Sequence, residues 1–328
     1  MNRSFVGLIP DPILASIAVC SIGTPCKVSD HRSFIRPLKR AADGLRRISY
    51  PCLMWKIAPF RSWTGALLGL LALLAPAAGQ EKVDVALVLA VDVSRSMSPE
   101  ELDIQRKGYA AAISSPEVVR AIELGAHGRI ALMMFEWANE NHAREIVGWS
   151  VIETQEDALV FADKVLKDRS FGQRRTSISG AIRHAAAILA DVPFETYRKV
   201  IDISGDGPNN QGLPVTPVRD AALEEGLVIN GLPLMTKGGI GFQFNIPDLD
   251  EYYRRCVTGG PASFVIPVIE WAQFPDAVRR KLILEIGGRV PAEVPKVLKA
   301  QIRFGEPYDC LIGEKIWRRL RQQYFWDP

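Results

Sequence analysis

The sequence predicts an α/β protein in three layers (α/β/α), with an open, mostly parallel β-sheet between helices on both faces. Runs of aliphatic and β-branched residues have the length of strands buried on both faces, as in residues 83–91 (VDVALVLAV) and 199–204 (KVIDIS). Segments with helical patterns, about ten to fifteen residues long, separate these runs, which is typical of βαβ units. A composition of 48% apolar and 23% charged residues is that of a globular chain.

The first strand, residues 83–91, leads through the loop DVSRSM into a helix with a clear start. Ser98 stands in the N-cap position, Pro99 is the first helical residue, and Glu101 completes a capping box. The helix is expected to continue through Tyr109 and Ala112.

The same alternation continues to residue 285 and predicts a Rossmann-like arrangement. Further strands are expected at residues 130–135, 146–150, 199–204, 227–233 and 263–268, and further helices at 156–166, 177–190, 215–225, 248–256 and 270–285. Because parallel crossovers are right-handed, the loops from strand to helix meet at one edge of the sheet, where such sheets bind ligands. We therefore expect one domain, residues 81–288, with its functional residues at this edge.

Residues 54–79 are predicted to be a secretory signal peptide. Lys56 and Arg61 precede an uncharged apolar run at residues 65–75, and Ala75-Pro76-Ala77 has the small residues typical of a cleavage point. The run is too short to span a bilayer, which takes about 20 residues; the alternative is a buried core helix. We expect a secreted or periplasmic protein, associated with a membrane only if residues 65–75 remain uncleaved.

Residues 1–53 precede this signal, and we interpret them as a doubtful upstream extension, with translation starting at Met54. The alternative is an N-terminal extension with a function of its own. Residues 78–328 hold 30 Lys/Arg and 34 Asp/Glu. This slightly acidic balance argues against nucleic acid as a partner.

Residues 289–328 are expected to form a C-terminal extension. Pro291 and Pro295 interrupt the pattern, and a basic helix follows at residues 313–323 (GEKIWRRLRQQ), either as a solvated face or as a surface for a membrane or a partner. Cys256 and Cys310 are the cysteines of the exported part. In an oxidising compartment they suggest a disulfide that fastens the extension; the alternative is two separate buried thiols.

Oxygen-bearing side chains gather at the predicted edge of the sheet. Asp92, Ser94 and Ser96 follow the first strand at alternate positions, so one carboxylate and two hydroxyls can converge on one point. Thr176, in a loop that enters a helix, and Asp206, at the end of a long buried strand, fall on the same edge. Hard oxygen ligands suit Mg²⁺, Mn²⁺ or Ca²⁺ and not zinc.

These motifs, D-x-S-x-S, T-x-x-x-G-A-I and S-G-D-G, together resemble the metal-ion-dependent adhesion site (MIDAS) of von Willebrand factor type A (vWA) domains. The resemblance implies that Ser94, Ser96 and Thr176 offer hydroxyls to the metal, while Asp92 and Asp206 bind it directly or through water. It also implies an adhesion module whose metal takes water, or a carboxylate of a protein or peptide partner, at its open position. The stretches VDVSRSM, ISGDGPNN and YYRRCVTGGPASFV further resemble the bacterial domain-of-unknown-function family 1194 (DUF1194), which implies no activity.

Several residues near the site depart from the vWA pattern or flank it. Arg95 stands where glycine is frequent, Gly205 replaces the usual threonine before Asp206, and Arg174-Arg175 replace a frequent glycine pair. The three arginines either add positive potential that favours acidic partners or are simply solvated. Asp202, Asn209 and Asn210 flank the metal loop, and the two asparagines are interpreted as turn formers.

We expect no enzyme. A phosphatase-type nucleophile requires a second aspartate two residues after the first, where Ser94 stands. His31, His127, His142 and His184 lack metal-ligand spacing, His184 is interpreted as structural, and no phosphate-binding loop is present in the sequence. The alternatives to an adhesion module are a domain with a purely structural metal and a metal-dependent hydrolase.

Overall fold

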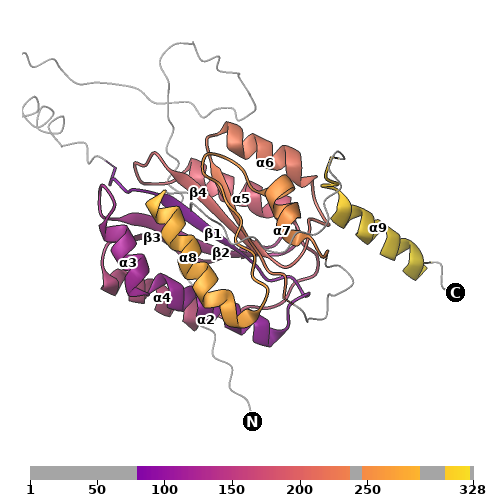
Figure 1. The fold of residues 1–328 in the computed structure, drawn as a ribbon, viewed down its shortest axis with the longest axis horizontal. Coiled ribbons are helices and arrows are strands. Elements are labelled where there is room, and N and C mark those ends of the chain that lie inside the picture. Colours follow the sequence, from indigo (N-terminus) through magenta and orange to yellow (C-terminus); the bar gives the residue numbers. More distant parts are fainter. Residues whose placement is uncertain (1–79, 237–245, 289–306, 326–328) are drawn as a thin grey trace, which may run out of the picture. The chain divides into compact units, whose positions relative to one another are not determined.

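The computed structural model describes residues 80–236, 246–288 and 307–325. The predicted upstream extension (1–53) and signal peptide (54–79) lie outside these residues, as does the first part of the predicted C-terminal extension, residues 289–306. Figure 1 shows a central sheet with helices on both faces.

Five strands form one sheet in the order β3-β2-β1-β4-β5. β1 (Ala86–Asp92) lies at the centre and pairs in parallel with β2 (Ile130–Trp137) and β4 (Lys199–Gly205). β5 (Val228–Pro233) extends the parallel sheet beyond β4, and β3 (Ala143–Ile152) is an antiparallel edge strand. Every residue of β1 is buried, whereas β3 is partly exposed along its length. The open, mostly parallel sheet confirms the predicted fold class.

Two layers of helices cover the sheet (Figure 1). The first layer contains α2 (Pro99–Ile113), α3 (Pro116–Glu123), α4 (Gln155–Lys167) and α8 (Phe274–Gly287). The second contains α5 (Ile178–Ala190), α6 (Val215–Glu224) and α7 (Leu249–Tyr252), which continues into a π-helical turn, Tyr253–Val257. Alternate residues of β1 face the two layers, so an apolar cluster covers each side of the strand. α9 (Ile312–Phe325) is the last described helix.

The start of α2 confirms the predicted capping box. Ser98 Oγ accepts a hydrogen bond from the backbone N–H of Glu101 (3.2 Å), and the backbone N–H of Ser98 donates to Glu101 Oε2 (2.7 Å). The other carboxylate oxygen, Oε1, accepts from Trp271 Nε1 at 2.8 Å. Glu101 therefore both begins α2 and holds the residues that lead into α8.

The structure differs from the predicted local structure in three places. Residues 263–268, predicted as a last strand, form only isolated bridges, Gly231↔Val265 and Leu234↔Val268. Ile266 and Val268 each donate a backbone hydrogen bond to β5, but Pro233 of β5 has no N–H to donate to the Ile266 carbonyl, so the ladder is interrupted between these bridges. α3 was not predicted; it begins at the N-cap Ser115 and is only eight residues long. The predicted helix 248–256 is divided into α7 and the π-helical turn.

A buried ion cluster joins α8 to the sheet. Lys281 Nζ lies 2.6 Å from Asp202 Oδ1 on β4 and 2.5 Å from Glu285 Oε1, and all three side chains are fully buried. Asn230 Nδ2 donates to the same Glu285 oxygen (3.0 Å), while Oε2 has no hydrogen-bond partner among the described residues. Burial raises the pKa of Glu285 to about 7, although the charge of Lys281 acts in the opposite direction.

Glu285→Gln should make the free energy of unfolding less sensitive to pH. The pKa of Glu285 rises from 4.5 to about 7 on folding, so the folded protein holds a proton that the unfolded chain releases between these values. The stabilisation from this proton is present at low pH and is lost as the pH rises through about 7. Glutamine has no such proton to lose. In denaturant unfolding, the free energy of unfolding of the variant minus that of the wild type should therefore increase by about 1–3 kcal/mol from about pH 5 to about pH 8.

The matched control is Glu224→Gln, which removes an exposed carboxylate from α6 and should follow the wild-type pH dependence. Parallel pH curves for Glu285→Gln and the wild type would contradict the prediction.

Candidate metal centre

The two carboxylates of the predicted site lie at the same edge of the sheet. Asp92 is the last residue of β1, and Asp206 directly follows β4, the parallel neighbour of β1. Both side chains are buried, with 0% of Asp92 and 7% of Asp206 exposed. Gln105 Nε2 of α2 donates to the backbone oxygen of Asp92 (2.9 Å) and so holds the end of β1 in place.

Two serine hydroxyls connect these carboxylates. The backbone N–H of Ser94 donates to Asp92 Oδ1 (2.7 Å), and Ser94 Oγ donates to Asp92 Oδ2 (3.1 Å). Ser94 Oγ lies 2.8 Å from Ser96 Oγ, which in turn donates to Asp206 Oδ1 at 2.7 Å. Four of the five predicted ligands therefore form one continuous chain of oxygen atoms.

Thr176, the fifth predicted ligand, is buried between the other two motif loops. Its backbone N–H donates to Asn210 Oδ1 (3.0 Å), and its carbonyl accepts from the backbone N–H of Asn210 (2.8 Å). Three residues before Thr176, Gln173 forms two backbone hydrogen bonds with the loop after β1. Its carbonyl accepts from the N–H of Arg95 (2.7 Å), and its N–H donates to the carbonyl of Val93 (2.8 Å). The structure thus brings the three motifs together at the predicted edge.

The two carboxylates carry raised pKa values. Burial raises the pKa of Asp92 well above its usual range, and the negative charge of Asp206 raises it further, although hydrogen bonds from Ser94 lower it. Burial raises the pKa of Asp206 to about 6, against the lowering effect of hydrogen bonds from Ser96 and Ser94. Among the described residues, no lysine or arginine ranks among the main influences on either pKa. Ionisation of the pair therefore calls for an added positive charge.

This set of donors fits a hard divalent cation. Mg²⁺, Mn²⁺ and Ca²⁺ prefer oxygen ligands, and the carboxylates and hydroxyls at this edge are all oxygen donors. A cation beside Asp92 and Asp206 would attract both carboxylates, offset the repulsion between them and favour their ionised forms. Over the parts of the chain that the structure describes, no three His, Cys, Asp or Glu side chains form a metal-binding group. A metal at this edge therefore depends on the hydroxyls as well as on the carboxylates.

Tyr253 gives a physical reason for glycine at position 205, where the vWA pattern has threonine. A Cβ atom on Gly205 would lie 2.8 Å from the Tyr253 hydroxyl and 2.9 Å from Asp92 Oδ2. Tyr253 is fully buried in the π-helical turn, and its hydroxyl has no hydrogen-bond partner among the described residues. The tyrosine hydroxyl thus occupies, next to a candidate ligand, the space that a side chain at position 205 would need.

Asn209 and Asn210 do more than form the turn that the sequence indicated. Asn209 is fully buried; its Oδ1 accepts from the backbone N–H of Ser179 (3.1 Å), at the start of α5, and its backbone N–H donates to the Tyr252 hydroxyl (3.1 Å). Asn210 holds Thr176, as described above. The two asparagines therefore connect the loop after β4 to Thr176, α5 and α7, a role beyond the turn formation that the sequence analysis gave them.

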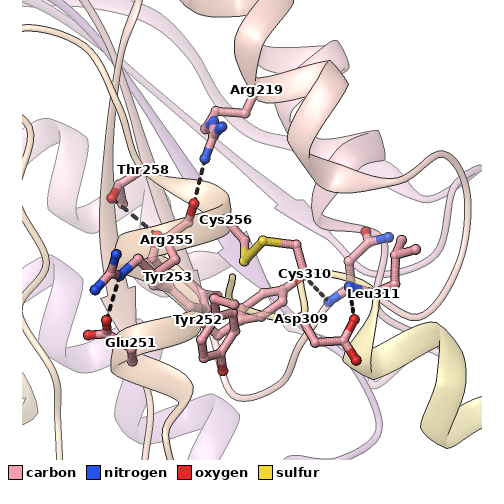
Figure 2. Close-up of a disulfide and its surroundings, with 12 residues drawn as sticks. Arg219, Glu251, Tyr252, Tyr253, Arg255, Cys256, Thr258, Asp309, Cys310 and Leu311 are labelled. Atoms are coloured by element: carbon pink, nitrogen blue, oxygen red, sulfur yellow. Dashed lines mark hydrogen bonds and ion pairs between the residues drawn. A yellow bond between two sulfur atoms is a disulfide. The ribbon is translucent and has the colours of Figure 1, made fainter. Parts of the chain in front are cut away.

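The C-terminal helix α9 completes this network. Cys256 and Cys310 are joined by a disulfide, which fastens the segment before α9 to the π-helical turn (Figure 2). Asn209 Nδ2 donates to Glu314 Oε1 of α9 at 2.7 Å. A Cβ atom on Gly313 would overlap the carbonyl of Asn209, so the start of α9 lies directly against the loop that follows β4. α9, which lies outside the predicted domain, thus still contributes to the edge that holds the candidate ligands.

The described histidines lie apart from the oxygen chain. His184 of α5 packs edge-on against Phe135 at a centroid distance of 4.8 Å, and burial lowers its pKa. His142 and His184 line a cavity of about 420 Å³ beside the loop from β2 to β3. No contact between a histidine and the five candidate ligands is found within the described residues.

Comparison with known proteins identifies one family and several similar folds. Residues 82–290 match a family described as "Protein of unknown function (DUF1194)". No curated protein matches the chain. Among solved structures, the chain is similar to proximal thread matrix protein 1 of the mussel byssus, at 10% identity over 63% of this chain and 49% of that chain, with a TM-score of 0.46. A further structure of that mussel protein has a zinc-occupied MIDAS motif.

Two other similar structures come from bacteria. The pilus adhesin SpaC of Lactobacillus rhamnosus GG is 12% identical over 63% of this chain and 31% of that chain, with a TM-score of 0.44. A von Willebrand factor type A protein of Catenulispora acidiphila is 15% identical over 63% of this chain and 43% of that chain, with a TM-score of 0.42. The chain thus spans less than half of the length of each of these three proteins.

Gly205→Ala should destabilise the protein, and Tyr253→Phe should relieve part of the loss. The added methyl group would press on the Tyr253 hydroxyl, and overpacking of this kind costs about 1–3 kcal/mol. Tyr253→Phe alone removes a buried hydroxyl without a described partner, so it should be close to neutral. In denaturant unfolding, the double variant should lose less free energy than the sum of the two single variants.

Gly207→Ala is the matched control in the same loop, because nothing lies within 4 Å of a Cβ atom built there. It should leave the free energy of unfolding nearly unchanged. Strict additivity of the Gly205 and Tyr253 substitutions would show that the two side chains do not compete for this space.

Proposed function

The chain belongs to the DUF1194 family, and we propose that it is an exported, vWA-like binding module that engages a protein or peptide through a divalent metal bridge. Mg²⁺ is the proposed ion, with Mn²⁺ or Ca²⁺ as alternatives. The proposed ligands are Asp92, Ser94, Ser96, Thr176 and Asp206.

The chain of oxygen atoms from Asp92 through Ser94 and Ser96 to Asp206 is the observation that carries this proposal. It lies at the carboxyl edge of a parallel sheet, where such folds bind ligands. Mg²⁺ takes about six oxygen ligands, and the three hydroxyls together with Asp92 and Asp206, which bind directly or through water, leave a position for water or for a carboxylate of the partner. When bound, the metal would supply the positive charge that attracts this carboxylate.

A binding role accounts for the donor set better than catalysis does. Ser94 stands where a phosphatase-type site has its second aspartate. Asp92 and Asp206 are tied to serine hydroxyls and are not paired with a histidine or a cysteine in the described part of the chain. A purely structural metal is the second candidate. It would stabilise the fold in the same way but would not recruit carboxylate-bearing partners.

Export is part of the same proposal. The disulfide between Cys256 and Cys310 suits an oxidising compartment such as the periplasm. The proposed signal, residues 54–79, lies outside the described residues. None of the described helices is long and apolar enough to cross a membrane.

The proposal predicts that Mg²⁺ stabilises the protein and that Asp206→Asn abolishes this effect. A ligand that binds only the folded state adds about 2.7 kcal/mol at a concentration of about 100 times its Kd. In chelator, the variant should be at least as stable as the wild type, because it removes one of two buried carboxylates that repel each other. Calorimetric titration of Mg²⁺ and Mn²⁺, together with thermal unfolding of the metal-free and metal-loaded protein, measures both effects.

Asp103→Asn is the matched control, since Asp103 is an exposed carboxylate on α2. It should retain metal binding. If the wild type gains no stability in millimolar Mg²⁺, Mn²⁺ or Ca²⁺, the metal-bridging function is wrong.

A further inference from the structure

Arg175 is held in a backbone conformation that favours glycine. Its φ of 79° lies in the left-handed region, where a side chain of this size is rare and costs free energy. The residue directly precedes Thr176, a candidate metal ligand. A glycine here would remove the strain, so we expect interactions of the arginine side chain that offset this cost.

The side chain of Arg175 reaches α9. Its guanidinium carbon lies 3.3 Å from the centre of the Trp317 ring, a stacked cation–π arrangement. Nη1 also donates a long hydrogen bond to the carbonyl of Asn210 (3.4 Å), the residue that holds Thr176. The guanidinium is therefore placed between α9 and the edge with the candidate metal ligands.

Arg321 adds a second guanidinium on the same helix. It follows Trp317 by four residues, so it lies on the same face of α9, one turn further on. In the described part of the chain, neither arginine forms an ion pair with a carboxylate. The stack on Trp317 therefore brings the Arg175 guanidinium to the face of α9 that also carries Arg321.

An anion at this face of α9 would be attracted by both guanidinium groups. Guanidinium groups present planar forks of N–H donors that match the two oxygens of a carboxylate. A partner carboxylate on the proposed metal would lie at the same edge of the sheet, because Thr176 is adjacent to Arg175 in the chain. The edge therefore offers two attractive positions for acidic groups.

We propose that Arg175 and Arg321 form a second carboxylate site beside the metal, so that the partner is a segment with two acidic side chains, one for the metal and one for the arginine pair. This inference rests on the proposed metal-bridging function and specifies the partner. α9, fastened by the Cys256–Cys310 disulfide, thereby contributes directly to the binding surface.

Short fluorescein-labelled glycine–serine peptides test the proposal. One peptide carries a single aspartate, and the others carry two aspartates separated by one to four residues. Fluorescence anisotropy with the Mg²⁺-loaded full chain should show that at least one two-aspartate peptide binds about tenfold more tightly than the single-aspartate peptide. This advantage should shrink as the salt concentration rises, because the arginine pair is partly exposed.

Three variants separate the arginine site from the metal. Arg175→Gly relieves the strained φ and should fold normally, bind Mg²⁺ as the wild type does, and lose the advantage of the two-aspartate peptide. Arg321→Gln should lose most of the same advantage. Arg319→Gln removes an equal charge from an exposed position on the other side of α9 and should retain it.

The outcomes distinguish this inference from the function on which it rests. If the single-aspartate peptide binds in a metal-dependent way but a second aspartate adds nothing, or if Arg175→Gly keeps the advantage, the arginine site is wrong and the metal bridge stands. If the Mg²⁺-loaded chain binds none of the peptides, the carboxylate bridge itself is wrong, and the second site with it.

Discussion

The parallel pairing of β1 and β4 is the constraint on which the candidate site depends. Their register joins Val91 to Ser204, so the residues that follow, Asp92 and Gly205-Asp206, leave the sheet side by side. Both strands are covered by apolar clusters on both faces, and this burial sets their register independently of the site. The hydrophobic core therefore holds together two carboxylates that would otherwise repel each other.

Most of the fold could be predicted from local patterns. Buried strands such as β1 and β4 are continuous aliphatic runs, and α2 has Ser98, Pro99 and Glu101 at its start, so each can be identified from adjacent residues alone. The last predicted strand was wrong because its ladder depends on a residue of another segment, Pro233 of β5, which has no N–H to donate to residues 263–268. The five candidate ligands could also be located, since a parallel sheet brings the ends of its strands to one edge.

The surroundings of the site could not be predicted in the same way. Tyr253, Asn209 and Glu314 act through contacts between segments far apart in the chain, and no spacing rule connects them with Asp92 or Thr176. The interpretation of Asn209 as a turn former described its local role but not its burial against α5, α7 and α9. Arg175 is similar: its residue type was visible in the sequence, but its strained backbone and its stacking on Trp317 were not.

The disulfide has a consequence for the order in which an exported chain matures. Cys310 follows Cys256 by 54 residues, so a chain that crosses a membrane from its N-terminus delivers every candidate metal ligand before the second cysteine. Until then Asn209 has no hydrogen bond to Glu314, and its hydrogen bonds connect the loop after β4 only to α5 and α7. If the chain is exported as proposed, the edge with the candidate ligands would thus be completed only when translocation is nearly finished and oxidation has followed.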